Sequence, residues 1–383
     1  MAAQPLYDLS PLLRLMLMGV VLALGPLAWV WLRNRHAAPA RRLQALTLLT
    51  LFLTFDLVLF GAFTRLTDSG LGCPDWPGCY GNASPSGAHA QISQAQAQMP
   101  TGPVTHGKAW VEMVHRYLAT GVGVLVLTLA AATAWQRRRG ALPVGLAWPV
   151  FTLLWICLQG AFGALTVTMK LFPAIVTLHL LGGMVLLALL CRQAVLYEHA
   201  QRGKGPVAMP APVWALLAAA FVLMWLQIAL GGWVSTNYAV LACTGFPACQ
   251  GSWWPAMDAS QGFELWRELG KTGTGEHISF AALTAIHYVH RLGAGVVLIA
   301  LAALCWQLRR GGYLPAQGRW IALLALWQLG SGLSNVVLDW PLAAALAHTG
   351  GAAGLVVVLT WALCESRLAP SAAAVPAGRR LSA

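Results

Sequence analysis

Long apolar segments separated by short polar ones dominate the sequence. Nine segments have about 20 or more mostly apolar residues, the length a helix needs to cross a bilayer. The first ends in Arg33-Asn34-Arg35 with no small-residue cleavage site after it, so we interpret it as a span rather than a signal peptide. The pattern predicts an all-α polytopic membrane protein. The predicted spans are roughly 11–32, 43–64, 109–135, 144–168, 173–195, 212–235, 278–306, 319–338 and 341–363.

The composition agrees with a membrane location. Of the 383 residues, 58% are hydrophobic and 9% are charged, whereas soluble domains carry roughly 25% charged residues. The net charge is +12, but the cations gather in short loops and not on a basic surface interleaved with aromatic residues. We therefore predict no nucleic-acid partner, and we expect membrane lipid around the protein.

The cations also predict the orientation, because loops rich in Lys and Arg face the cytoplasm. The loops after the odd-numbered spans hold 16 cations and the opposite loops hold five. The C-terminus is therefore predicted to be cytoplasmic and the two long loops to face outward. The 16 cations are Arg33, Arg35, Arg41, Arg42, Arg137, Arg138, Arg139, Arg192, Arg202, Lys204, Arg309, Arg310, Arg319, Arg367, Arg379 and Arg380.

The last eight spans form an internal repeat. Residues 61–81 align with 231–251 at an offset of 170, and His-Arg, Gln and His markers follow in the same order at offsets of 169 to 175. Each unit has four spans, so both have the same orientation, and a pseudo-twofold axis along the membrane normal is expected. The predicted domains are 1–41, an extra N-terminal helix and linker; 42–205 and 206–368, two four-helix bundles; and 369–383, a cytoplasmic tail.

Four histidines occupy matched places in the repeat. His115 and His179 lie in the second and fourth spans of the first unit, and His290 and His348 lie in the same spans of the second. Most are six or seven residues into a helix, which corresponds to a depth of roughly 10 Å. Paired imidazoles on facing helices of a bundle are a common way to hold a haem iron. A lone buried histidine is more often structural, but four matched ones favour ligands.

The residues beside these histidines also suggest roles. Arg116 and Arg291 directly follow two of them, and their planar guanidinium groups would suit haem propionates. Glycines after each histidine would make room for a flat macrocycle, although they would also permit close helix packing without a cofactor.

Five markers recur along the chain: TRLTDSGLGCPDWPGCYG at 64–81, EMVHR at 112–116, TLHLLGG at 177–183, HYVHR at 287–291 and His348. Together they resemble the motifs of haem A synthase, the membrane enzyme that oxidises the C8 methyl of haem O to the formyl of haem A for cytochrome oxidase. The resemblance covers residues 43–365. It implies haem O as the substrate between His115 and His179, and a permanent haem b between His290 and His348. The first helix lies outside the family pattern.

The resemblance also implies a bacterial cytoplasmic (inner) membrane location, with haem O handed over by haem O synthase. Oxidation of the methyl group also requires an electron acceptor, and a homo-oligomer is compatible with the small-residue helix faces.

One position separates the two units. Glu112 lies three residues before His115, on the same helix face, and His287 occupies that place in the second unit. We hypothesise that Glu112 is catalytic, as a proton acceptor or a stabiliser of positive charge. The alternative is a structural carboxylate that reaches the interface or pairs with a nearby arginine.

Two cysteine pairs lie in the outward loops, where disulfides form readily. The predicted bonds are Cys73–Cys79 and Cys243–Cys249, first as structural links and alternatively, for the first pair, as a redox-active group. Asp56 is a further acid within a span. It either pairs with a polar group such as Gln159 or serves the site.

Two rival functions remain open at this stage. A di-haem b-type cytochrome would use four histidines only to pass electrons, and a haem carrier would bind haem without chemistry. Neither accounts for the difference between Glu112 and His287 or for the detailed loop motif.

Overall fold

The computed structural model describes residues 10–142, 144–203 and 205–369. Within these residues nine helices are long and apolar enough to cross a membrane, as predicted. Lys204, Arg379, Arg380 and the predicted tail beyond Ala369 lie outside the described residues. The nine helices are α1 (Ser10–Asn34), α2 (Pro39–Leu66), α4 (His106–Arg138), α5 (Ala147–Thr168), α6 (Pro173–Arg202), α7 (Ala211–Thr236), α9 (Phe280–Gly311), α10 (Pro315–Val337) and α11 (Leu342–Cys364).

Local sequence signals fix several helix ends. Thr105 caps α4 by accepting a hydrogen bond from the Lys108 amide, and Ser279 caps α9 in the same way from the Ala282 amide. Pro173 occupies the first position of α6, where its missing N–H costs no hydrogen bond. Gly203 ends α6 in the left-handed region, with φ of 62°.

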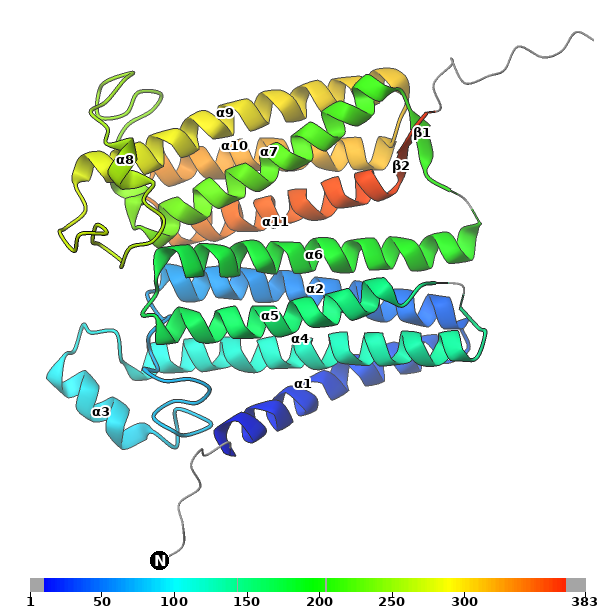
Figure 1. The fold of residues 1–383 in the computed structure, drawn as a ribbon, viewed down its shortest axis with the longest axis horizontal. Helices are drawn as coiled ribbons and strands as arrows, with labels where there is room; N and C mark the ends of the chain where they lie inside the picture. Colours follow the sequence, from blue (N-terminus) through cyan, green and yellow to red (C-terminus); the bar gives the residue numbers. More distant parts are fainter. Residues whose placement is uncertain (1–9, 143, 204, 370–383) are drawn as a thin grey trace, which may run out of the picture.

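All of these helices except α1 form two stacked groups (Figure 1), and each group has four helices by its contacts. In the first group α4 packs against α2 and α5, and α6 packs against the same two helices, so α4 and α6 lie diagonally. In the second group α9 and α11 lie diagonally in the same way, each against α7 and α10. Helices α2 and α6 of the first group contact α11 of the second. The predicted pair of four-helix bundles is therefore present.

The bundles meet through residues that are equivalent in the repeat. Nη2 of Arg65 donates to the Ser235 carbonyl at 2.6 Å, and the Tyr238 hydroxyl donates to Oδ1 of Asp68 at 2.6 Å. In both pairs the partners are 170 residues apart, the offset of the repeat. Residues that contact their own equivalents lie close to a twofold axis. Burial raises the pKa of the Tyr238 hydroxyl, which keeps it protonated as a donor.

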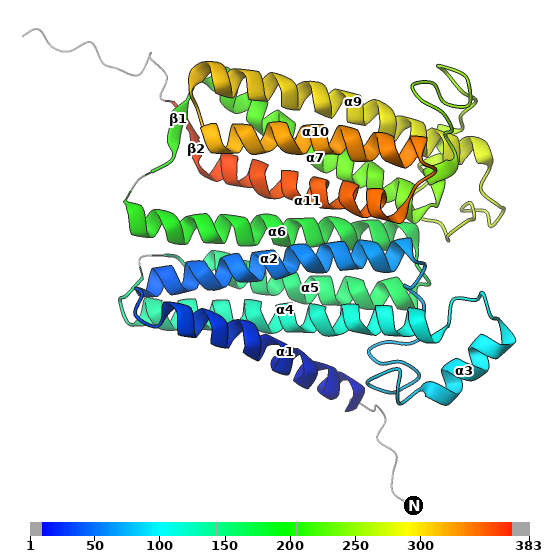
Figure 2. The ribbon, with the colours of Figure 1, turned by 180° about the vertical axis from the view of Figure 1, so that it is seen from behind.

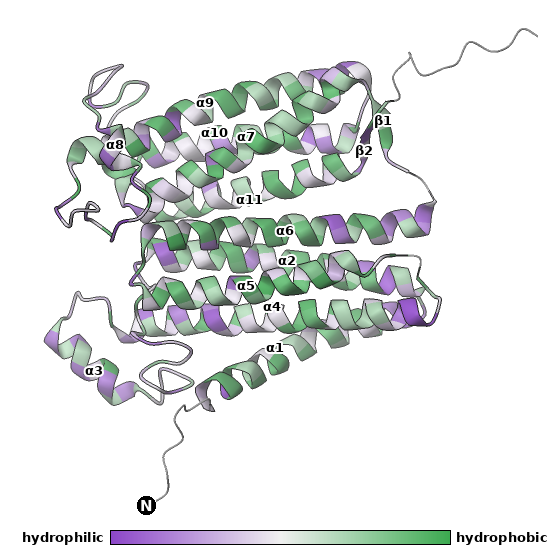
Figure 3. Ribbon diagram, in the orientation of Figure 1, coloured by the Kyte–Doolittle hydropathy of each residue, from purple (hydrophilic) through white to green (hydrophobic). Residues whose placement is uncertain are grey.

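The two ends of the molecule differ (Figures 1 and 2). The long loops and the short helices α3 (His89–Gln98) and α8 (Ala259–Gly262) gather at one end. At the other, β1 (Val207–Met209) pairs in parallel with β2 (Ser366–Leu368), which joins the beginning of the second unit to its end. Hydrophobic residues dominate the helices between these ends (Figure 3). The 3₁₀ turn η1 (Ala239–Leu241) follows α7.

The extra helix α1 packs along α4 outside the two bundles (Figure 2). A methyl group on Gly19 would lie 2.5 Å from Cγ2 of Thr120, so this glycine permits the close approach of the two helices. Leu15 of α1 shares an apolar cluster with Cys73 and Cys79. Helix α1 thus covers α4 and supports the first outward loop.

Candidate functional site

The four predicted histidines come together as two pairs. His115 on α4 faces His179 on α6 across the first bundle, and His290 on α9 faces His348 on α11 across the second. Within each pair the rings are close enough to interact electrostatically. Helix α4 begins at His106, nine residues before His115, which is earlier than predicted. Helix α9 begins at Phe280, ten residues before His290. The two histidines therefore lie at similar depths in their helices.

Each histidine ring lies against a glycine of the neighbouring helix. In the first bundle, a methyl group added at Gly61 would lie 3.0 Å from Cε1 of His115, and one added at Gly163 would lie 3.5 Å from Cε1 of His179. In the second bundle, the distances are 2.9 Å from Gly231 to His290 and 3.1 Å from Gly332 to His348. The absence of a side chain therefore lets each ring lie close to the helix backbone.

These glycines form a pattern that sequence reasoning only half recognised. Gly61 and Gly231 belong to the aligned segments 61–81 and 231–251, but their contact with histidines is visible only in three dimensions. Gly163 and Gly332 are also equivalent, at an offset of 169, the offset that relates His179 to His348. Extending the repeat alignment along the helices would have found them.

The ring nitrogens of the histidines are arranged for ligation in both bundles. Their Nε2 atoms make no hydrogen bond to the described residues and are not fully buried. The Nδ1 atoms of the second pair have polar neighbours. Nε2 of Gln227 lies 2.9 Å from Nδ1 of His290, and Oγ of Ser331 lies 3.0 Å from Nδ1 of His348.

The first pair lacks such neighbours. Nδ1 of His115 and Nδ1 of His179 are buried and have no hydrogen-bond partner among the residues that the structure describes. The amide of Gln159 is also buried and unpartnered at both its nitrogen and its oxygen, so the alternative in which Asp56 pairs with Gln159 is wrong. The equivalent Gln328 donates to the His348 carbonyl at 2.8 Å.

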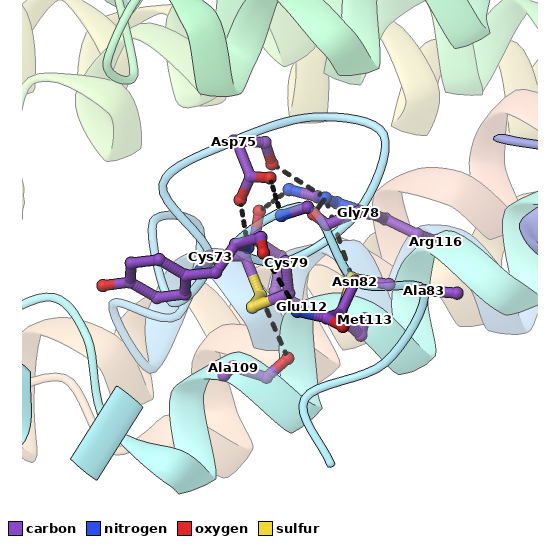
Figure 4. The surroundings of a disulfide bond; sticks show 12 residues. Cys73, Asp75, Gly78, Cys79, Asn82, Ala83, Ala109, Glu112, Met113 and Arg116 are labelled. Carbon is purple, nitrogen blue, oxygen red and sulfur yellow. Dashed lines mark hydrogen bonds and ion pairs between the residues drawn. A yellow bond between two sulfur atoms is a disulfide. The ribbon is translucent and has the colours of Figure 1, made fainter. Parts of the chain in front are cut away.

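Glu112 is buried one turn before His115 and bonds to the first outward loop (Figure 4). Its Oε2 accepts from the Cys73 amide at 2.8 Å, and its Oε1 forms an ion pair with Nη2 of Arg116 at 2.5 Å. Arg116 is also buried, and its Nη1 donates to the carbonyls of Asp75, Pro77 and Gly78 at 3.0, 3.2 and 2.5 Å. The two charges thus neutralise each other and hold the loop on α4.

In the second unit an arginine again holds the outward loop on its helix, but its partner on that helix is a histidine and not a carboxylate. Nε of Arg291 donates to Nε2 of His287 at 3.4 Å, and its terminal nitrogens donate to the carbonyls of Cys243 and, at 2.8 Å, Gly245. The arginine and its loop contacts are therefore shared between the units, whereas the carboxylate of Glu112 is replaced by the imidazole of His287. The predicted propionate contacts of Arg116 and Arg291 stay predictions.

Both expected disulfides are present in the outward loops. The bond between Cys73 and Cys79 and that between Cys243 and Cys249 have Cα–Cα distances of 4.9 and 5.0 Å. All four residues are buried. Each disulfide closes a loop segment whose carbonyls bind an arginine, which favours a structural link over a redox-active group.

A cavity of about 670 Å³ lies between α2 of the first bundle and α10 and α11 of the second. Aromatic and small residues line most of it, and Asp56 contributes a carboxylate. Phe60 lines the cavity and stacks on the His115 ring, with centroids 6.1 Å apart and planes 7° apart. Ala347 and Gly350 flank His348 on the other side. The cavity therefore lies between the two histidine pairs.

The residues present fit two haem groups. Each bundle offers two opposed imidazoles with free Nε2 atoms, at similar depth, with glycines where the rings meet the helices. Paired imidazoles of this kind are typical axial ligands of haem iron in helix bundles. The fold and the site define a polytopic membrane protein with two bis-histidine bundles.

Comparison with known proteins identifies the family. Residues 44–360 match the family described as cytochrome oxidase assembly protein, and the chain belongs to this family. It is 39% identical to a protein named heme A synthase from Shewanella oneidensis over 326 residues, which are 81% of this chain and 92% of the relative. It is 29% identical to a heme A synthase from Rhizorhabdus wittichii, covering 86% of this chain and 96% of the relative. A heme A synthase from Halalkalibacterium halodurans is 25% identical over 80% of this chain and 90% of its own length.

Proposed function

We propose that the protein is a haem A synthase, a membrane oxidoreductase that converts the C8 methyl of haem O to the formyl of haem A for cytochrome oxidase. The observation that carries the proposal is the pair of related bundles, each with two opposed histidines whose Nε2 atoms are free. The relatives named heme A synthase match most of the chain and support the same activity.

The two histidine pairs take different roles in this proposal. His115 and His179 hold haem O, the substrate, and His290 and His348 hold haem b, which supplies electron transfer when bound. The assignment is supported by the ionisable group beside each pair: the first has the Glu112 carboxylate and the second has His287. Oxidation of a methyl group releases protons and electron pairs, and a site that only transfers electrons needs no group to manage protons.

Glu112 is the proposed catalytic residue, as an acceptor of protons or a stabiliser of positive charge near the substrate. Its ion pair with Arg116 favours the charged carboxylate. The same contacts, however, give it a structural role in holding the loop at Cys73. Glu112→Gln separates the two roles, because glutamine keeps an oxygen that accepts hydrogen bonds but loses the charge.

We expect Glu112→Gln to retain haem and fold while its conversion of haem O falls by a factor on the order of 100, within the range for a general base. The measurement is haem A formed per purified protein, with thermal unfolding as the structural control. Full conversion by this variant, at normal haem content, would leave Glu112 with a structural role only.

The proposed location is the bacterial cytoplasmic membrane, with the C-terminus in the cytoplasm and the loops that contain the disulfides outside. Haem O synthase is the proposed source of the substrate. An electron acceptor must complete the oxidation, and the cavity between the bundles lies beside both histidine pairs.

Pigment extraction tests the proposed function directly. The full chain is expressed in a host that makes haem O but no haem A, and the haems are separated by chromatography. A synthase yields haem A. A cytochrome that only passes electrons yields haem b alone, and a carrier yields unchanged haem O, so either pattern would refute the proposal.

A further inference from the structure

The second histidine pair is surrounded by polar contacts that the first pair lacks. In the second bundle, Ser331 and Gln328 contact His348, and Gln227 contacts His290 at both Nδ1 and the backbone carbonyl. The Gln227 side chain lies over Gly293, where a methyl group would be 2.4 Å from its Oε1. The glycine therefore makes room for this amide.

The equivalent positions of the first bundle are apolar or unpartnered. The repeat offsets place Leu57 at the position of Gln227, Leu118 at that of Gly293 and Phe162 at that of Ser331. Gln159 matches Gln328, but its amide has no hydrogen-bond partner. None of the four polar contacts of the second pair is therefore made around the first pair among the described residues.

Ser331 selects one protonation state of His348. Its hydroxyl donates to the Trp327 carbonyl at 2.7 Å, so its oxygen is available to accept from His348 at 3.0 Å. A histidine whose Nδ1 carries the proton has an unprotonated Nε2, the nitrogen that binds iron. The contact thus prepares His348 as a ligand and fixes the orientation of its ring.

Gln227 holds His290 in a related way. Its amide nitrogen donates to the His290 carbonyl at 3.0 Å, which anchors the amide beside the ring. Its Oε1 has no partner in this orientation. The same nitrogen lies 2.9 Å from Nδ1 of His290, so Gln227 fixes the place of the ring, whereas the Ser331 hydroxyl oxygen is the acceptor offered to a ring N–H.

Partners of the second ring nitrogen orient a metal-bound histidine and raise its basicity, and their loss typically costs 10–100-fold in affinity. We propose that Ser331, assisted by Gln227, is a positioning residue that makes the second site retain its haem, and that the lack of such partners lets the first site exchange its haem. This inference rests on the proposed function, in which the first haem is substrate and leaves as product.

The experiment measures haem release from the full chain without any turnover. A background with His115→Ala and His179→Ala keeps only the second site and is expressed with haem b as the sole haem. Release is followed as transfer to excess apomyoglobin. Ser331→Ala is expected to speed release by about 10–100-fold and to make the reduction potential more positive, because a less basic imidazole stabilises ferric iron less.

Three further variants sharpen the test. Ser331→Thr keeps the hydroxyl and is expected to restore slow release. Ser334→Ala is the matched control, since its hydroxyl donates to the Gly330 carbonyl on the same helix and contacts no histidine. Phe162→Ser, in a background with His290→Ala and His348→Ala, is expected to slow release from the first site.

The outcomes separate this inference from the proposed function. If His348→Ala leaves the haem content of the second site unchanged, the haem assignment fails and the inference fails with it. If His348→Ala empties the site but Ser331→Ala changes neither the release rate nor the potential, only the positioning role is refuted. Faster release with a shifted potential, restored by threonine, supports it.

Discussion

A methyl group added at Gly231 is the sharpest test of the close contact between each histidine ring and a glycine of the neighbouring helix, which we call the histidine cradle. The alanine Cβ would lie 2.9 Å from Cε1 of His290, whereas carbon atoms in ordinary contact are about 3.5–4.0 Å apart. The ring would therefore have to move by roughly half an ångström or more. Functional groups need to be held within about 0.5 Å of their working positions, so we expect Gly231→Ala to lose most of the haem from the second site.

The same reasoning predicts an order for the four glycines. The added methyl would lie 3.0 Å from the ring at Gly61, 3.1 Å at Gly332 and 3.5 Å at Gly163. Haem loss should therefore be large for the changes at Gly231, Gly61 and Gly332, and slight for Gly163→Ala. Overpacking of a buried contact costs about 1–3 kcal/mol, which corresponds to about 5–150-fold in binding.

The assay is haem per protein after purification, measured for each bundle in a background with the other pair of histidines replaced by alanine. Gly330→Ala, on the helix that carries Gly332, is the matched control because no described residue lies within 4 Å of the added methyl. Alanine favours helices over glycine by about 0.5–1 kcal/mol, so this control should retain haem. Normal haem content in Gly231→Ala would refute the cradle.

Two further predictions concern the contacts that hold the site. Arg116→Ala should destabilise the protein by about 3–5 kcal/mol, because Glu112 would remain as a buried charge without its partner. A lower unfolding temperature and faster proteolysis of the loop at 67–105 would show this effect. Unchanged proteolysis would contradict the proposal that Arg116 holds the loop on α4. Tyr238→Phe should cost only about 0.5 kcal/mol, because the hydrogen bond to Asp68 that it removes is exposed to solvent. Because burial raises the pKa of Tyr238, its contribution should be constant across neutral pH and be lost only above about pH 10; a loss near neutrality would contradict this account of the contact.

The sequence predicts the spans, the repeat and the four histidines because these depend on period, composition and spacing. The apolar lengths set the nine helices, and the matched offsets pair His115 with His290 and His179 with His348. The strands at Val207–Met209 and Ser366–Leu368 are three residues long. They give no periodic signal, and their pairing joins segments far apart in the chain.

Contacts that cross between helices are the part that sequence reasoning missed. The sequence did not reveal that Arg116 and Arg291 bind carbonyls of the outward loops, and their contacts with haem propionates stay predictions. Nothing in the local sequence reveals that Ser331 meets His348 or that Gly163 meets His179. These contacts depend on helix rotation and on the diagonal arrangement of the bundles.

The division of labour between the two histidine pairs is the central claim, and one comparison tests it directly. Pigments are extracted from the wild type, His115→Ala and His348→Ala, each expressed with haem O and haem b available. The wild type should contain haem b and haem A, His115→Ala should contain haem b without haem A, and His348→Ala should contain haem O without haem A. Haem A in the His115→Ala protein, or its absence from the wild type, would contradict the account.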